Sequence, residues 1–195
     1  MSRPYSKISE AGSARKLDLR AGVRSIESLV QEHYGFVWRV LRGLGLSRAD
    51  ADDAAQQVFM IAARKLDSIA PESARSFVYG SALRVAKNVR RGLQRRREVP
   101  NDDMSDLVEP EALGPEHTTE LTLARSLLAE LLAQLPEKFR RVLILAELEQ
   151  LEVSEIAALE QLPVGTAASR LRVARQQFRE LLEAARDRNP FLSDA

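Results

Sequence analysis

The feature of this sequence that most restricts its fold is a reversal of charge near the middle of the chain. Residues 84–97 contain seven Lys or Arg and no acid, whereas residues 98–117 contain seven Asp or Glu and no Lys or Arg. The acidic stretch also holds three prolines and a glycine and lacks helical periodicity, which indicates a linker. The chain is therefore predicted to divide into two halves, a division that its net charge of +1 hides.

Composition narrows the class of protein further. The chain has 195 residues, of which 45% are apolar and 29% are charged, as is typical of globular proteins. It has no cysteine, which excludes disulfide and thiolate metal sites, and only two histidines, which disfavours a histidine metal centre. No run of ~18 apolar residues predicts a membrane-spanning helix, and no apolar signal core precedes the first half. We therefore expect a cytoplasmic protein without membrane insertion.

Apolar residues recur at helical spacing in both halves, and runs of β-branched residues are few, which predicts an all-α fold. We expect two small helical domains joined by an acidic, flexible linker. The first helix is expected to end at Gly43 and Gly45, the second to begin after Ser47 in a capping-box-like turn, and the third to cover about residues 74–97. The predicted segments are a basic extension (1–24), a first domain (25–97), the linker (98–118), a second domain (119–188) and a tail (189–195).

The third predicted helix carries a basic stripe. Arg84, Lys87, Arg91 and Arg95 are spaced by three, four and four residues, so they share one face. Such a face fits a polyanion, most often nucleic acid, although a solvated helix end is equally common for a bare charge run. Tyr79, upstream of the stripe, is predicted to be exposed and available to stack on bases, whereas nearby Phe77 is expected in the core.

The second half has the layout of a helix-turn-helix. Ser154 is predicted to cap a short helix that ends near Leu159, a tight break follows at residues 160–163, and a longer helix begins near Val164. This pattern alone leaves a plain helical bundle open. Early in the longer helix lie residue types that contact phosphates and guanine edges: Thr166, Ser169, Arg170 and Arg172.

Three acids near the start of the second predicted helix allow a catalytic alternative. Asp50, Asp52 and Asp53 resemble the carboxylates of a metal-dependent hydrolase, but acids are also favoured in the first turn of any helix by its dipole. No second carboxylate or histidine cluster completes a metal site. We therefore expect neither metal nor cofactor, and no enzyme.

Both halves together resemble a sigma-70 family sigma factor of the extracytoplasmic-function (ECF) type, which keeps only the second and fourth sigma regions. The order and spacing of the motifs carry this resemblance. The matching stretches are Asp50–Phe59, Ala82–Asn88 with Arg95–Arg97, Leu135–Pro136, Ser154–Ala157 and Pro163–Leu171.

The resemblance implies a promoter-specificity subunit that binds core RNA polymerase and both promoter elements. The clamp helices of the largest polymerase subunit would be bound by Asp52, Asp53, Gln56 and Gln57. The −10 non-template strand would be held by Ser76, Tyr79, Arg84, Lys87, Asn88, Arg91 and Arg95. The −35 duplex would be read by Thr166, Ser169, Arg170, Arg172 and Arg175. The β flap of polymerase and an anti-sigma factor would be further partners, and a stand-alone helix-turn-helix regulator is the alternative function.

The sequence departs from the family pattern at five positions. Gln57 replaces a Glu, Ser81 a Trp, and Gln161 a turn Gly where a positive φ is common. Ala168 and Val173 replace basic residues of the recognition helix, which predicts weak intrinsic binding to the −35 element.

The linker has a mechanical role under this resemblance. About 20 residues span ~65 Å when extended but only ~25 Å as a coil. Promoter elements over ~35 Å apart would require it to extend, and its acids would suit the basic cleft of polymerase. Reversing the charges of Asp102, Asp103 and Asp106 is expected to impair initiation.

Overall fold

The computed structural model describes residues 25–98 and 118–188, and every regular element within these ranges is helical. The predicted all-α fold is confirmed. The predicted extension, the tail and all but the ends of the predicted linker lie outside the described residues. The elements are α1 (Ile26–Gly43), α2 (Arg48–Ala63), η1 (Leu66–Ser68), η2 (Pro71–Ser73), α3 (Ala74–Glu98), α4 (Thr118–Gln134), α5 (Glu137–Leu143), a π-helical turn η3 (Ile144–Leu148), α6 (Val153–Glu160) and α7 (Val164–Arg188).

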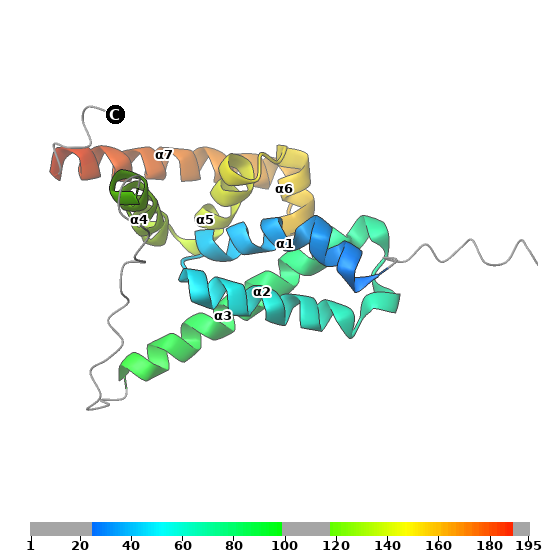
Figure 1. Ribbon diagram of the computed structural model, residues 1–195. Coiled ribbons are helices and arrows are strands. Elements are labelled where there is room, and N and C mark those ends of the chain that lie inside the picture. Colours follow the sequence, from blue (N-terminus) through cyan, green and yellow to red (C-terminus); the bar gives the residue numbers. More distant parts are fainter. Residues whose placement is uncertain (1–24, 99–117, 189–195) are drawn as a thin grey trace, which may run out of the picture.

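Helices α1, α2 and α3 form the first half, with small side chains at their contacts (Figure 1). Ser25 caps α1, and Ser47 caps α2 by accepting a hydrogen bond from the Asp50 N–H at 3.1 Å. The buried face of α2 is rich in alanine, which lets α1 and α3 approach its backbone closely. The fully buried alanines are Ala51, Ala54, Ala55 and Ala62.

The second half contains the predicted helix-turn-helix, α6 followed by α7. The predicted cap Ser154 is wrong by two positions: Glu152 precedes the helix, and its N–H donates to the Glu155 carboxylate at 2.8 Å. A carboxylate at the third helical position satisfies a backbone donor that Ser154, already inside the helix, has no need to cap. Gln161 closes α6 with φ 54° and ψ 48°, so this residue adopts the left-handed conformation predicted from its place in the turn.

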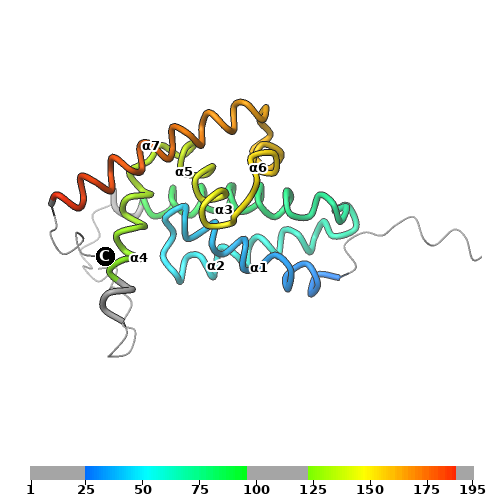
Figure 2. The backbone as a smooth tube through the Cα atoms, turned by 90° about the horizontal axis from the view of Figure 1, so that it is seen from above, coloured from blue at the N-terminus to red at the C-terminus, as the bar shows by residue number. Residues whose placement is uncertain are grey.

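The two halves are packed against each other through one continuous core. Figures 1 and 2 show α5 and α6 lying over α1 and α3. At the centre of this contact Gly43 faces Ile144, and a Cβ added to Gly43 would lie 2.8 Å from the Ile144 Cδ1 atom. Both residues are buried, so the two backbones approach this closely only because Gly43 lacks a side chain.

A buried guanidinium also joins the halves. Arg140 is 9% exposed and donates to the carbonyl oxygens of Ala133 at 2.6 Å and Leu135 at 3.0 Å, where α4 ends. Its other terminal nitrogen reaches the Leu44 carbonyl, at the end of α1, at 3.5 Å. Burial is the largest influence on the Arg140 pKa and lowers it. The guanidinium thus binds the carbonyl ends of helices from both halves.

We predict that Gly43→Ala destabilises the packed arrangement by about 1–3 kcal/mol, because Ile144 is 2% exposed and has no space to move into. Chemical denaturation followed by circular dichroism measures the effect. Gly92→Ala is the matched control: the added Cβ meets nothing within 4 Å, so the exposed helix should gain about 0.5–1 kcal/mol. Equal effects at both positions would contradict the close contact.

Candidate nucleic-acid and polymerase interfaces

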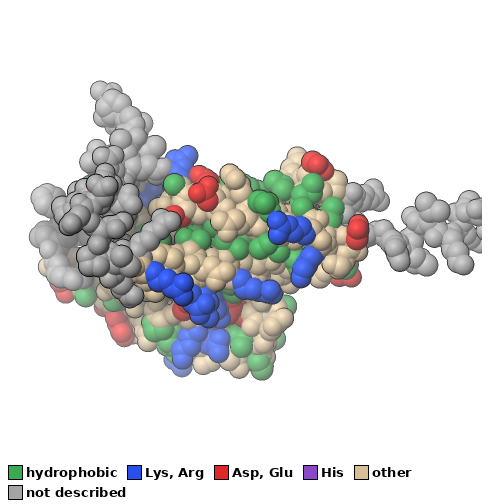
Figure 3. All heavy atoms as spheres, turned by 90° about the horizontal axis from the view of Figure 1, so that it is seen from below, with side chains coloured by type: hydrophobic (Ala, Val, Ile, Leu, Met, Phe, Trp, Pro, Cys, Tyr) green, Lys and Arg blue, Asp and Glu red, His purple; other side chains and the backbone are tan. Residues whose placement is uncertain are grey.

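The basic stripe of α3 is exposed to solvent as predicted. Arg84, Lys87, Arg91 and Arg95 are all exposed, and within the described part of the chain none of them forms an ion pair. A band of Lys and Arg side chains crosses the underside of the molecule, where α2 and α3 lie (Figure 3). Unpaired cations along one helix face can bind successive phosphates of a nucleic-acid strand. Ser76 and Asn88, the other predicted polar residues of this helix, are exposed too.

Tyr79 contradicts the exposure predicted for it. Its side chain is 2% exposed, its ring lies 6.2 Å from the Phe36 ring between centroids, and its hydroxyl donates to the Glu160 carboxylate. Burial, with the nearby Glu160 charge, raises the pKa of Tyr79 well above its ordinary value, so the hydroxyl remains a donor. The prediction failed because α6 covers this face of α3, which helical spacing within α3 does not reveal. Phe77 is half-buried against the core, in line with its prediction.

The predicted polymerase-binding residues of α2 divide into two groups. Asp53, Gln56 and Gln57 are exposed. Asp52 is half-buried and its Oδ1 accepts hydrogen bonds from Trp38 Nε1 at 2.7 Å and Tyr34 Oη at 3.1 Å. Asp52 therefore fixes α1 to α2, a role that the sequence pattern did not indicate.

The acids of α2 do not form a metal site. Asp50 accepts a hydrogen bond from the Ser47 hydroxyl at 2.7 Å and so belongs to the helix cap. Among the described residues no group of three or more His, Cys, Asp or Glu is placed to hold a metal ion. The interpretation of these acids as residues of a helix start agrees with this geometry.

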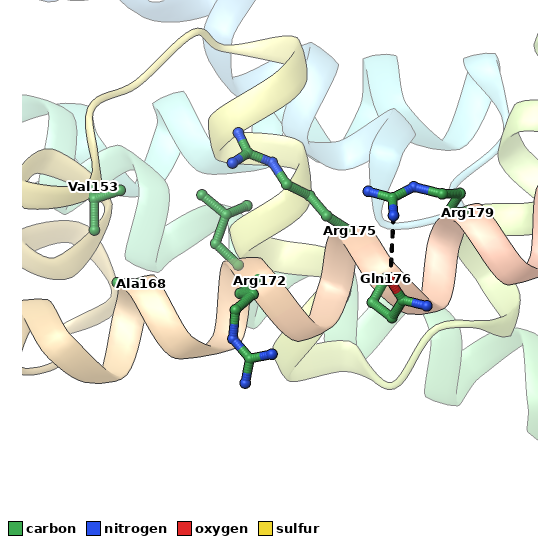
Figure 4. A pocket seen from close by; sticks show the side chains of 7 residues that line it. Val153, Ala168, Arg172, Arg175, Gln176 and Arg179 are labelled. Carbon is green, nitrogen blue, oxygen red and sulfur yellow. Dashed lines mark hydrogen bonds between the residues drawn. The ribbon is translucent and has the colours of Figure 1, made fainter.

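The predicted −35 residues line the first turns of α7. Ser169 and Arg172 are exposed, Thr166 and Arg170 are half-buried, and Arg175 pairs through its Nε with Glu147 at 2.8 Å. Beside them is a groove of about 540 Å³ with Leu171 in its lining and arginines from successive turns of α7 (Figure 4). Ala168, one of the departures from the family pattern, is exposed at this groove and places a methyl group there; Val173 is half-buried. The lining residues that the sequence did not single out are Val153, Gln176 and Arg179.

Comparisons with known proteins match the two halves in the same order. The Sigma-70 region 2 family matches residues 29–97, and the Sigma-70, region 4 family matches residues 125–178. The ECF RNA polymerase sigma-E factor of Escherichia coli (strain K12) is 33% identical over 138 residues, which are 65% of this chain and 71% of that protein. The chain belongs to the ECF group of the sigma-70 family.

Another relative in this family is longer than the present chain. The ECF RNA polymerase sigma factor SigE of Mycolicibacterium smegmatis (strain ATCC 700084 / mc(2)155) is 29% identical over 165 residues, which cover 84% of this chain and 63% of the relative. The present chain therefore spans less than two thirds of that sigma factor.

Solved structures share the fold of this sigma factor. CnrH in complex with the cytosolic domain of CnrY superimposes with a TM-score of 0.63 at 22% identity, covering 84% of this chain and 91% of that one. The sigma factor RpoE in complex with the anti-sigma factor NepR from Bartonella quintana gives 0.58 at 20% identity, covering 80% and 96%. In the described parts of the chain, no helix combines the length and apolar character needed to span a membrane.

We predict that Asp52→Ala destabilises the first half by about 1–2 kcal/mol, because the half-buried Trp38 indole loses its acceptor. Urea unfolding followed by Trp38 fluorescence measures this, since Trp38 is the single tryptophan of the chain. Asp53→Ala, one position along the same helix, removes an exposed carboxylate and should leave the unfolding midpoint unchanged. If both variants unfold at the wild-type midpoint, Asp52 does not stabilise the α1–α2 contact.

Proposed function

We propose that this chain directs core RNA polymerase to specific promoters and helps to melt the −10 element. The observation that carries the proposal is an exposed, unpaired cationic face on α3 in the same chain as a helix-turn-helix, with both in the order of the family's regions. One face suits single-stranded DNA and the other suits duplex DNA. The chain would work in the bacterial cytoplasm, where RNA polymerase works.

The proposed roles follow the exposed residues. Asp53, Gln56 and Gln57 would contact the clamp helices of the largest polymerase subunit, with Asp52 holding their helix in place. The β flap would bind the second half. The −10 strand would follow the α3 stripe together with Ser76 and Asn88, and the −35 duplex would meet the first turns of α7. Solved relatives of this fold are complexes with CnrY and with an anti-sigma factor, which supports an anti-sigma partner here.

Two other functions fit the chain less well. A stand-alone helix-turn-helix regulator would use α6 and α7 but leave the α3 stripe and the α2 face without a role, and it would need a dimer to bind paired half-sites. A metal-dependent hydrolase would need ligands beyond Asp50 and Asp53, and Asp50 is engaged by Ser47. Members of this family initiate transcription, and we infer no catalytic role for the chain.

Reconstituted transcription tests the proposal directly. The chain is mixed with core polymerase and genomic DNA, and the 5′ ends of the transcripts are sequenced. We expect start sites that share −10 and −35 sequences and disappear without the chain. Binding to DNA without binding to core polymerase would instead support the stand-alone regulator.

We predict that Arg91→Ala weakens promoter opening and lowers the salt dependence of binding by ~0.7 in log–log slope, the value for one lost single-strand phosphate contact. Binding of polymerase carrying the chain to a promoter with an unpaired −10 region, measured at several salt concentrations, gives this slope. Arg186→Ala, which removes an exposed cation from the far end of α7, should leave the slope unchanged. Matching slopes for Arg91→Ala and wild type would remove Arg91 from the DNA contacts.

We predict that Ala168→Lys combined with Val173→Arg strengthens −35 binding, because each added phosphate contact steepens the salt dependence by ~0.9. Duplex binding by polymerase carrying each form of the chain measures the change, with Glu183→Lys as a control that adds positive charge elsewhere on α7. Unchanged affinity in the double variant would show that the missing cations do not limit −35 binding.

A further inference from the structure

Helix α3 has a second cationic face, opposite the exposed stripe. Arg75, Tyr79 and Arg90 are spaced by four and eleven residues, close to one and three helical turns, so they lie on the side that faces the second half. Each of the three is in contact with a glutamate of that half. Arg75 lies 3.9 Å from Glu155, Arg90 lies 3.0 Å from Glu137, and the Tyr79 hydroxyl donates to Glu160.

The charges across this contact all have the same polarity. A further pair joins Arg39 of α1 to Glu149 through two hydrogen bonds of 2.8 Å. In each described ion pair between the halves the cation comes from the first half and the carboxylate from the second. The second half thus presents a row of negative charges to a surface with cations and an aromatic ring, the composition of a single-strand-binding site.

Glu160 is the best-fixed of these carboxylates. Its side chain is 1% exposed, and its Oε2 atom accepts from Arg141 Nη2 at 2.8 Å and Nε at 3.1 Å, while Oε1 accepts from Tyr79. Arg141 lies in the same half, so it holds the glutamate in position against α3. A buried carboxylate with three donors is costly to remove, because its partners would lose their acceptor.

We propose that Arg75, Tyr79 and Arg90 form a concealed single-stranded DNA site, and that Glu137, Glu155 and Glu160 of the same chain occupy it as an internal competitor. The site rests on the proposed function, since it extends the −10 contact to a second face of α3. When the halves separate, the two guanidinium groups would bind phosphates and the Tyr79 ring would stack on a base. The fraction of closed chain would then raise the apparent Kd for DNA.

Glu160→Gln tests the proposal in the full chain without polymerase. Because the chain has no cysteine, Ala49→Cys and Ala133→Cys, exposed positions in the two halves, can carry a fluorescent donor and acceptor. We expect Glu160→Gln to reduce energy transfer and to lower the Kd for a labelled single-stranded DNA of mixed sequence by about three- to tenfold. Glu183→Gln removes one negative charge from an exposed site of the same half and is expected to change neither measurement.

Two further variants separate the latch from the site. Tyr79→Phe keeps the ring but removes its hydroxyl, so it is expected to reduce energy transfer even if Glu160→Gln fails to fold, which circular dichroism will show. Adding Arg75→Gln to Glu160→Gln should abolish the gain in DNA affinity. Unchanged energy transfer in both Glu160→Gln and Tyr79→Phe would overturn the competitor role. A gain in affinity that survives Arg75→Gln would overturn the site. Neither result depends on core polymerase, so a failure here is distinct from a failure of promoter-directed transcription.

Discussion

The packing of the two halves depends on how buried polar groups from one half are satisfied by the other. Arg140 donates to carbonyl oxygens at the end of α4 and reaches the last turn of α1, so its burial requires both helix ends to stay in place. Gly43 lies beside this contact and leaves room for Ile144. A guanidinium in such a place is stable only while its carbonyl partners surround it, which fixes the angle between the halves.

Local spacing predicted the features of this chain that depend on one helix at a time. The stripe from Arg84 to Arg95 is exposed because residues three and four apart share a face whatever surrounds the helix. The cap at Ser47 and the left-handed Gln161 were likewise evident from local sequence. Chain order alone placed the helix-turn-helix after the basic helix, and this order carried the family resemblance.

Contacts between distant segments could not be predicted in this way. Tyr79 and Glu160 are 81 residues apart, and no periodicity in either helix indicates that they meet. Asp52 looked like one of several surface acids, yet Trp38 and Tyr34 from α1 reach its carboxylate. Glu152 rather than Ser154 precedes α6, because the chain enters that helix earlier than the serine suggested. Each error concerns a partner supplied by tertiary structure or by a shift of two residues at a helix end.

The contact between the halves combines a small apolar centre with charge pairs of unequal strength. Arg75 and Glu155 are both substantially exposed and 3.9 Å apart, so salt screens their attraction and they add little. Glu149 and Glu160, with side chains 2% and 1% exposed, are held much more firmly. A promoter whose elements lie over ~35 Å apart cannot be bound while α6 touches α3, so the proposed function requires these carboxylates to leave their partners. Phosphates of the promoter would offer the freed arginines charges of the same sign, and polymerase would only need to supply the remaining difference in free energy.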